Sequence, residues 1–215
     1  MSFAFAAPAQ VSVPVLGSDH PFPVRRVYCV GRNYAEHVME MGGEAGRDPP
    51  FFFSKPPDAL VLDGRFPYPS MSSDVHHEIE LVVALGPDAA IFGYAVGLDM
   101  TRRDLQAAAK KLGRPWETAK GFDHSGPISA IAPLKSALTS GAITLDVNGA
   151  RRQTGDVADM IWSVSAIMAE LGKLFTLKAG DLIFTGTPAG VGPVQRGDRL
   201  HGAIEGIGTL DVTVV

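Results

Sequence analysis

The segment HHEIELVVAL at residues 76–85 begins with polar side chains and continues as an apolar run. A run of Ile, Leu and Val of this length, followed by Gly86, is typical of a β-strand. Side chains of a strand alternate between its two faces, so Glu78 and Glu80 are expected on the same face. The segment therefore predicts an apolar strand that brings two carboxylates together near its start.

Apolar runs of strand length also occur in much of the remaining chain, and each is bounded by Gly, Pro or Asp. They are 26–30, 51–54, 91–98, 143–147, 182–185 and 207–215. The 24 glycines and 16 prolines are spread throughout, which favours many short elements over a few long helices. Asn148-Gly149 predicts a tight hairpin turn, because this pair readily adopts positive φ angles. We expect sheets to dominate the fold.

Only two segments are predicted as longer helices. The first opens at Thr101, as a cap with Asp104 three residues on, and ends near Gly113. The second covers about 157–171, stops at Gly172, and has an apolar stripe at helical spacing, made of Met160, Ile161, Val164, Ile167, Met168 and Leu171. This alternation of helix and strand is too sparse for a doubly wound parallel sheet. We therefore predict an α+β fold, mostly β, with rolled or layered mixed sheets.

Bulk properties indicate one packed domain in the cytoplasm. The chain has 215 residues, of which 46% are hydrophobic and 20% charged. Its net charge of −4 comes without a basic block, which argues against nucleic acid and anionic membranes as partners. No apolar run is long enough to cross a bilayer, and the N-terminus does not resemble a secretory signal. The single cysteine, Cys29, lies in the apolar run VYCV and is expected in the core.

A third carboxylate, Asp99, ends the apolar run IFGYAVGLD, where a strand gives way to a predicted helix. Carboxylates held close together raise one another's pKa, and a hard cation with oxygen ligands removes that repulsion. Glu78, Glu80 and Asp99 are therefore candidate ligands of Mg²⁺ or Mn²⁺. His76 is a further candidate on the same face. In the alternative interpretation, the two glutamates face solvent on an edge strand and Asp99 merely precedes a helix.

Six motifs follow one another along the chain: VGRNYAEH (30–37), FFFSKP (51–56), HHEIEL (76–81), GLDMTRRDLQ (97–106), RPWETAKGFD (114–123) and GDLIFTGTPAGVGPV (180–194). Together, in this order, they resemble the fumarylacetoacetate hydrolase family, in its short single-domain acylpyruvate hydrolase branch. The resemblance runs from about residue 25 to the C-terminus. It implies a fold of rolled mixed sheets and a homodimer. We expect residues 1–24 to form an extension that packs on a single catalytic domain, residues 25–215.

The resemblance also implies roles for individual residues. The metal is held at Glu78, Glu80 and Asp99, in agreement with the interpretation from strand periodicity. A catalytic pair, His37 and Glu40, lies in a short segment that closes over bound substrate. The remaining implied positions are Lys120, beside the metal-bound substrate, and the substrate-binding residues Arg103, Gln106 and Thr187. Taken alone, His37 and Glu40 would be read as an ordinary exposed helix pair.

Within this branch the whole-length pattern is most similar to fumarylpyruvate hydrolases of gentisate breakdown. The resemblance implies hydrolysis of a carbon–carbon bond in an acylpyruvate, with fumarate and pyruvate as products. Such a substrate carries two carboxylates, and the second one requires a basic partner, for which Arg32, Lys55 and Arg103 are the candidates. TGTPAGVG lacks the Gly-Lys-Ser/Thr of a phosphate loop, so a nucleotide site is not expected.

The same chemistry serves other reactions. Acetylpyruvate hydrolysis and oxaloacetate decarboxylation both produce an enolate that a metal stabilises, and related isomerases exist in the family. A non-catalytic protein of the same fold that only binds a metal or ligand is the alternative from another class. His37 and Glu40 argue against it.

Overall fold

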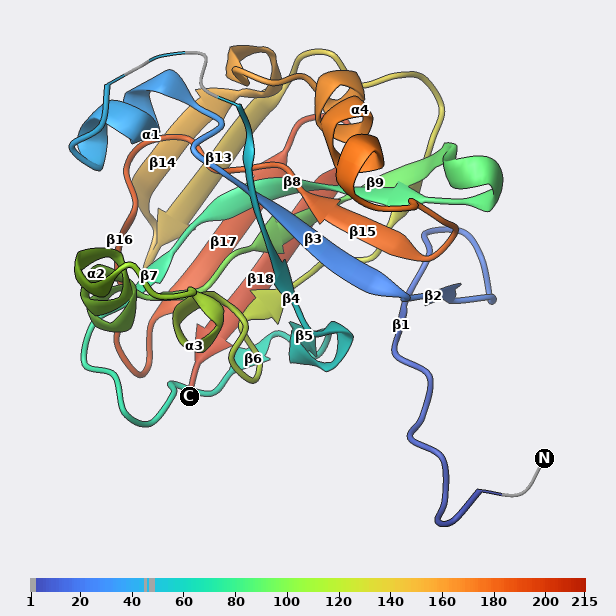
Figure 1. The fold of residues 1–215 in the computed structure, drawn as a ribbon, viewed down its shortest axis with the longest axis horizontal. Coiled ribbons are helices and arrows are strands. Elements are labelled where there is room, and N and C mark those ends of the chain that lie inside the picture. The colour runs from blue at the N-terminus through green and yellow to red at the C-terminus, as the bar shows by residue number, and fades with distance from the viewer. Residues whose placement is uncertain (1–2, 45, 47–48) are drawn as a thin grey trace.

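A six-stranded mixed sheet forms the centre of the structure, a computed structural model that describes residues 3–44, 46 and 49–215 (Figure 1). The strands lie in the order β12-β9-β8-β15-β3-β4. They are β3 (Arg26–Gly31), β4 (Phe51–Lys55), β8 (Ile79–Leu85), β9 (Ile91–Leu98), β12 (Ala132–Pro133) and β15 (Asp181–Phe184). β3 and β15 are parallel, and the other neighbouring strands are antiparallel.

A second, five-stranded sheet lies in the order β14-β13-β17-β18-β6. Its strands are β6 (Arg65–Phe66), β13 (Ala142–Val147), β14 (Ala150–Asp156), β17 (Arg199–Ile204) and β18 (Gly208–Val214). β13 and β14 form an antiparallel hairpin. Asn148 and Gly149 have φ angles of 53° and 79°, so the predicted hairpin turn is confirmed.

Smaller elements complete the fold. The short strands are β1 (Ser12–Val13), β2 (Phe22–Pro23), β5 (Leu60–Val61), β7 (Val75–His77), β10 (Thr101–Arg102), β11 (Gly126–Pro127) and β16 (Gly192–Pro193). The helices are α1 (Ala35–Glu40), α2 (Arg103–Leu112), α3 (Glu117–Lys120) and α4 (Val164–Leu174), with 3₁₀ turns at Pro57–Ala59, Pro87–Ala89 and Val157–Asp159. Among the described residues no helix is long and apolar enough to cross a membrane. The predicted α+β class, with mostly β structure in mixed sheets, is confirmed.

β8 is buried along its whole length because both of its faces meet a core. Leu81 and Val83 point into the core between the two sheets, with side chains such as Leu145 of the second sheet. Val82 and Ala84, on the opposite face, belong to a second core. A strand covered on both sides reads as a continuous apolar run, which is the pattern that the sequence shows.

The N-terminal segment contributes to that second core. β1 pairs with β2, and the side chains of Val13, Val15 and Phe22 are buried in the same cluster as Val82 of β8. Cys29 is also in this cluster and fully buried, as expected from its apolar surroundings. The division of the chain into an extension and a catalytic domain at residue 24 stays a prediction.

The expected start of the first helix is wrong. α2 begins at Arg103, and Thr101 instead lies in the short strand β10. Its hydroxyl donates to the carbonyl oxygen of Asp99 at 3.0 Å and accepts from Lys120, so it does not cap a helix. Asp104 accepts from Ser72, in the loop before β7. The predicted end at Gly113 is correct, because this residue has the left-handed conformation that terminates helices.

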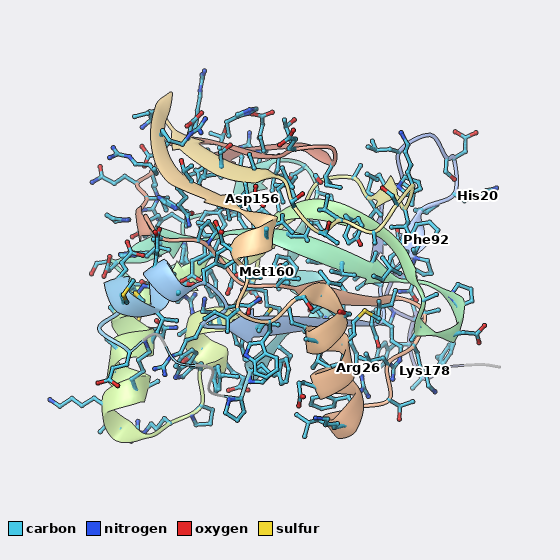
Figure 2. All side chains as sticks on the ribbon, turned by 90° about the horizontal axis from the view of Figure 1, so that it is seen from above. His20, Arg26, Phe92, Asp156, Met160 and Lys178 are labelled. Atoms are coloured by element: carbon cyan, nitrogen blue, oxygen red, sulfur yellow. The ribbon has the colours of Figure 1, made fainter. Side chains whose placement is uncertain are left out.

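The second predicted helix is two separate elements. Asp156 caps the 3₁₀ turn Val157–Asp159, while Ser163 caps α4, and the chain between them is not helical (Figure 2). Gly172 lies inside α4, so the expected stop there is wrong. Two capping side chains seven residues apart make two helical starts, which an apolar stripe alone does not reveal.

Candidate active site

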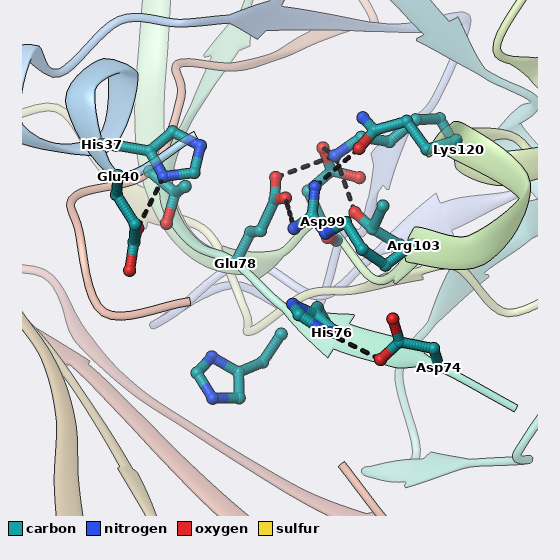
Figure 3. A network of polar contacts seen from close by, with 12 residues as sticks. His37, Glu40, Asp74, His76, Glu78, Asp99, Arg103 and Lys120 are labelled. Carbon is teal, nitrogen blue, oxygen red and sulfur yellow. Dashed lines mark hydrogen bonds and ion pairs between the residues drawn. The ribbon is translucent and has the colours of Figure 1, made fainter. Parts of the chain in front are cut away.

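Three carboxylates converge where β8 and β9 pair. Glu80 lies in β8, Glu78 directly precedes it, and Asp99 directly follows β9. The backbone N–H of Asp99 donates to the carbonyl oxygen of Glu78 at 2.8 Å, which holds the two chain segments together. One carboxylate oxygen from each residue lies within 4.8 Å of the others. Figure 3 shows Glu78 and Asp99 with the basic side chains that contact them. The exposed fractions of Glu78, Glu80 and Asp99 are 5%, 1% and 1%, so this is a buried cluster rather than a solvated edge strand.

Basic side chains from three other elements contact two of these acids. Lys120 Nζ lies 2.8 Å from Glu78 Oε2 and 2.6 Å from Asp99 Oδ2. Lys55 Nζ lies 2.7 Å from Asp99 Oδ1, and Arg103 Nη2 lies 2.5 Å from Glu78 Oε1. Burial by itself raises the pKa of Glu78, but Lys120 and Arg103 outweigh it and hold that pKa well below its usual range. Burial lowers the pKa of Lys120, yet Asp99 and Glu78 raise it to about 12.

Glu80 differs from its two neighbours. Its Oε2 accepts a hydrogen bond from the backbone N–H of Gly186 at 2.8 Å, and no basic side chain in the described part of the chain forms an ion pair with it. Burial, then the nearby charges of Asp99 and Glu78, raise its pKa well above the ordinary value. An additional cation between the three acids would relieve this repulsion. The donor set, three carboxylate oxygens, is the one that hard divalent ions such as Mg²⁺ and Mn²⁺ prefer.

His37 and Glu40 form a hydrogen-bonded pair on α1, as their spacing predicts. His37 Nδ1 lies 3.1 Å from Glu40 Oε2, and Glu40 Oε1 accepts from the backbone N–H of Gly190 at 3.0 Å. Because a carboxylate only accepts, Nδ1 carries the proton and Nε2 is left as the basic nitrogen of the ring. Gly190 has φ 95°, and a Cβ there would collide with the carbonyl oxygen of Arg152, so glycine is required at this position.

The loop that leads into α1 is fixed by one buried amide. Asn33 Nδ2 donates to the carbonyl oxygens of Thr185 at 2.8 Å and Trp162 at 3.0 Å. Its Oδ1 accepts from the backbone N–H of Trp162 at 2.7 Å. Asn33 therefore joins the start of α1 to the end of β15 and to the segment before α4, and this fixes where His37 lies relative to the acids.

A small cavity brings most of the predicted residues together. Of the nine site residues predicted from the sequence, eight line it: His37, Glu78, Glu80, Asp99, Arg103, Gln106, Lys120 and Thr187. Glu40 stands behind His37. His76 does not join the acidic cluster, because its ring bonds Asp74 Oδ1 at 2.9 Å instead. Arg103 Nη1 donates to Gln106 Oε1 at 2.7 Å, so these two residues share a face of α2 as expected.

A known protein family and several relatives match most of this chain. The family described as "Fumarylacetoacetate (FAA) hydrolase C-terminal" matches residues 26–215. The chain belongs to this family. A fumarylpyruvate hydrolase of Ralstonia sp is 45% identical over 176 residues, which cover 76% of this chain and 92% of the relative. An oxaloacetate tautomerase of Escherichia coli K12 is 44% identical over 200 residues, covering 86% and 90%.

A solved structure extends the likeness to the whole fold. It is the crystal structure of a fumarylpyruvate hydrolase from Pseudomonas aeruginosa in complex with Mn²⁺ and pyruvate. It has 49% sequence identity and a TM-score of 0.96, and the match covers 100% of this chain and 99% of that one. A chain that superposes over its whole length shares the fold of that structure.

The sequence did not indicate three polar residues that build the site in this family member. The sequence suggests Lys55 only as a partner for substrate, but its side chain is fully buried and also donates to the carbonyl oxygen of Lys120. It suggests Thr101 only as a helix cap. Gln153, in β14, contacts Thr187, and no sequence pattern marks it as a site residue. A lysine that ends an aromatic strand and a glutamine inside a polar strand give no local signal of burial.

Proposed function

We propose that this chain is a metal-dependent hydrolase that cleaves a carbon–carbon bond of an acylpyruvate, with fumarylpyruvate as its main substrate and fumarate and pyruvate as products. The main observation behind this proposal is that three buried carboxylates share one cavity with His37. The Nδ1 atom of this histidine is hydrogen-bonded to Glu40, which leaves Nε2 as the basic nitrogen. The fumarylpyruvate hydrolase with Mn²⁺ and pyruvate, at 49% identity, supports the choice of substrate.

The donor set fits one Mg²⁺ or Mn²⁺ held by Glu78, Glu80 and Asp99. When bound, such an ion supplies a Lewis acid for the keto-acid end of the substrate. In the mechanism that we propose, His37 Nε2 accepts a proton from a water molecule as its oxygen adds to the acyl carbonyl carbon. The bond from that carbon to the methylene group then breaks, and the electron pair leaves as pyruvate enolate. His37 returns the proton to the methylene carbon, which gives pyruvate.

Two other residues assist these steps. Glu40 keeps the proton on His37 Nδ1, so the nitrogen that faces the reaction is the basic one. Lys120 Nζ already contacts Glu78 and Asp99, and it places a positive charge where the enolate develops. Stabilisation that increases toward the transition state raises kcat rather than only tightening substrate binding.

Fumarylpyruvate has a second, distal carboxylate, which requires a basic side chain of the protein. Lys55 is buried against Asp99, and Arg103 is held by Glu78 and Gln106. Arg32 lines the cavity and, within the described residues, has no ion pair or side-chain hydrogen bond. Lys110 lines the same cavity, where the charge of Arg32 acts on it, and its Nζ lies 5.1 Å from the centre of the Trp116 ring. We therefore propose that Arg32, with Lys110, binds the distal carboxylate of fumarylpyruvate at the mouth of the cavity.

A second candidate activity is keto–enol interconversion of oxaloacetate, supported by the tautomerase relative at 44% identity. Oxaloacetate presents the same keto-acid end, so the acidic site alone does not separate the two reactions. Oxaloacetate decarboxylation and acetylpyruvate hydrolysis use this end as well.

A substrate panel tests the function directly. We expect purified protein with Mn²⁺ to hydrolyse fumarylpyruvate with a higher kcat/KM than acetylpyruvate, and to act more slowly on oxaloacetate, followed both as loss of the enol absorbance and as release of CO₂. A rate on oxaloacetate well above the rate on fumarylpyruvate overturns the assignment.

The same panel applied to Arg32→Asn tests the distal contact. Asparagine tolerates the left-handed φ of 61° at this position, so the variant removes charge without backbone strain.

For Arg32→Asn we expect the KM for fumarylpyruvate to rise about 10-fold, the typical effect of losing a charge-assisted hydrogen bond. The KM for acetylpyruvate, which lacks the distal carboxylate, should change little. Arg65→Ala, at an exposed arginine of β6 outside the cavity, is the control and should leave both values unchanged. An equal rise for the two substrates would show that Arg32 does not select the distal carboxylate.

Glu80→Gln tests the metal site without an activity assay. The variant keeps the side-chain shape and removes one of three anionic ligands, so Mn²⁺ affinity measured by titration calorimetry should fall on the order of 100-fold. Glu117→Gln makes the same change at an exposed residue of α3 and should bind Mn²⁺ normally. Wild-type affinity in Glu80→Gln would exclude Glu80 as a ligand.

His37→Ala tests the general base. Loss of a positioned base lowers turnover by roughly 10²- to 10⁴-fold, while Mn²⁺ affinity should stay near that of the wild type. His20→Ala, at an exposed histidine of the N-terminal segment, is the control. The hypothesis fails if kcat for fumarylpyruvate is unchanged in His37→Ala.

We also propose that the enzyme is a homodimer in the cytoplasm. A concave surface beside the edge strand β4 is lined by the aromatic side chains of Phe51, Phe53, Trp116 and Phe175. Large exposed aromatic patches of this kind are typical of interfaces between proteins. Light scattering on the purified chain should give twice the monomer mass, and a monomer mass at micromolar concentration would contradict the proposal.

A further inference from the structure

Gln153 connects three parts of the candidate site through one buried amide. It lies in β14, its side chain has no exposed surface, and its contacts reach β7, the start of β8 and the loop after β15. Oε1 lies 3.1 Å from the backbone nitrogen of Ile79 and 2.9 Å from His77 Nδ1. Nε2 lies 2.8 Å from Thr187 Oγ1 and 2.9 Å from the carbonyl oxygen of Pro188. All four hydrogen-bonding positions of the amide are occupied.

Two backbone groups fix which way this amide points. The N–H of Ile79 only donates, so it must face Oε1, and the carbonyl oxygen of Pro188 only accepts, so it must face Nε2. A flipped amide would set donor against donor at one end and acceptor against acceptor at the other. The direction of the two side-chain contacts follows from this without any assumption about protons.

The first consequence is that His77 donates through Nδ1, because Gln153 Oε1 has no hydrogen to offer. The second is that the Thr187 hydroxyl receives a hydrogen from Gln153 Nε2. The hydroxyl then keeps its own hydrogen for another acceptor. Within the described part of the chain it has none, although Thr187 is only 2% exposed and lines the same cavity as Glu80 and His37.

We propose that Gln153 is a positioning residue that commits the Thr187 hydroxyl to donate into the cavity, to a carboxylate or carbonyl oxygen of the bound substrate. This rests on the proposed function, because it takes the cavity as the place where an acylpyruvate binds. It adds to that function a fixed hydrogen-bond direction at Thr187. The hydroxyl binds an oxygen that accepts a hydrogen bond, and it rejects a group that can only donate one. A glutamine that merely filled space in β14 would have no such effect.

The polarity argument is tested by a double-mutant cycle. Gln153→Glu keeps the shape but offers only accepting oxygens when ionised, so the Thr187 hydroxyl turns toward residue 153. Thr187→Val removes the hydroxyl at nearly constant volume. We expect each variant to weaken pyruvate binding to the Mn²⁺-loaded protein about 10-fold, and to raise the KM for fumarylpyruvate more than it lowers kcat. The double variant should be no worse than either single one, because both remove the same hydrogen bond.

Two controls separate this role from a structural one. Thr187→Ser keeps the hydroxyl and should bind pyruvate within about threefold of the wild type. Gln153→Met fills the space without polar atoms, leaves the hydroxyl free to rotate, and should weaken binding less than Gln153→Glu does. Mn²⁺ affinity measured without substrate should be unchanged in all of these variants. Losses that multiply to about 100-fold in the double variant, or equal losses in Gln153→Glu and Gln153→Met, overturn the proposal.

A measurement on the unaltered protein covers the case in which Gln153→Glu does not fold. In ¹⁵N-histidine-labelled wild type, NMR should find the hydrogen of His77 on Nδ1, with the resonance assigned by its loss in His77→Asn. A hydrogen on Nε2 would reverse the inferred direction of the amide and overturn the proposal. If instead wild type neither binds Mn²⁺ nor hydrolyses fumarylpyruvate, the proposed function fails, and the state of His77 still decides how Gln153 is oriented.

Discussion

The repulsion among three buried carboxylates is the constraint around which the rest of this structure is arranged. Two unit charges about 4 Å apart repel by roughly 4 kcal/mol at an effective dielectric constant near 20, and burial adds a desolvation cost for each acid. The fold offsets this with basic side chains from elements that are distant in sequence: Lys55 from β4, Arg103 from α2 and Lys120 from α3. These ion pairs hold the edge strand β4 and the helices α2 and α3 against the place where the start of β8 pairs with the end of β9.

Backbone N–H groups also bind acidic side chains of the site, and this explains the irregular segments near the cavity. Gly186 donates to Glu80, and Gly190 donates to Glu40, each from a residue with φ of 95°. A Cβ at Gly186 would lie 2.7 Å from that of Asn33, so the loop after β15 packs directly on the loop before α1. The glycines of TGTPAGVG therefore allow two loops to pack closely and supply two backbone hydrogen-bond donors. Their presence does not require a phosphate site.

Strand periodicity predicts that Glu78 and Glu80 share one face, because side chains alternate with a period of two. It leaves open whether that face is buried or exposed to solvent, and the family resemblance favoured the metal site. Asp99 followed from its place at the end of the neighbouring strand. The contacts of Lys55 and Gln153 were not predictable in this way, since each depends on which strands pair and on how distant loops return. The prediction of the second helix was wrong for a local reason. Ser163 caps α4, but the apolar stripe does not distinguish a new helix start from a continuing helix.

The arrangement of charge also bears on why this chain resembles both a hydrolase and a tautomerase. Both reactions need a site that accepts negative charge at a keto-acid end, and the acidic cluster with Lys120 provides it for either. Hydrolysis further requires that a water molecule and a base reach the acyl carbonyl, which lies farther along the substrate. In this chain the buried His37 and the exposed Arg32 line the same cavity as the acidic cluster. We therefore expect the preference between the two reactions to depend on the residues that bind the acyl end, because the buried acids can serve either one.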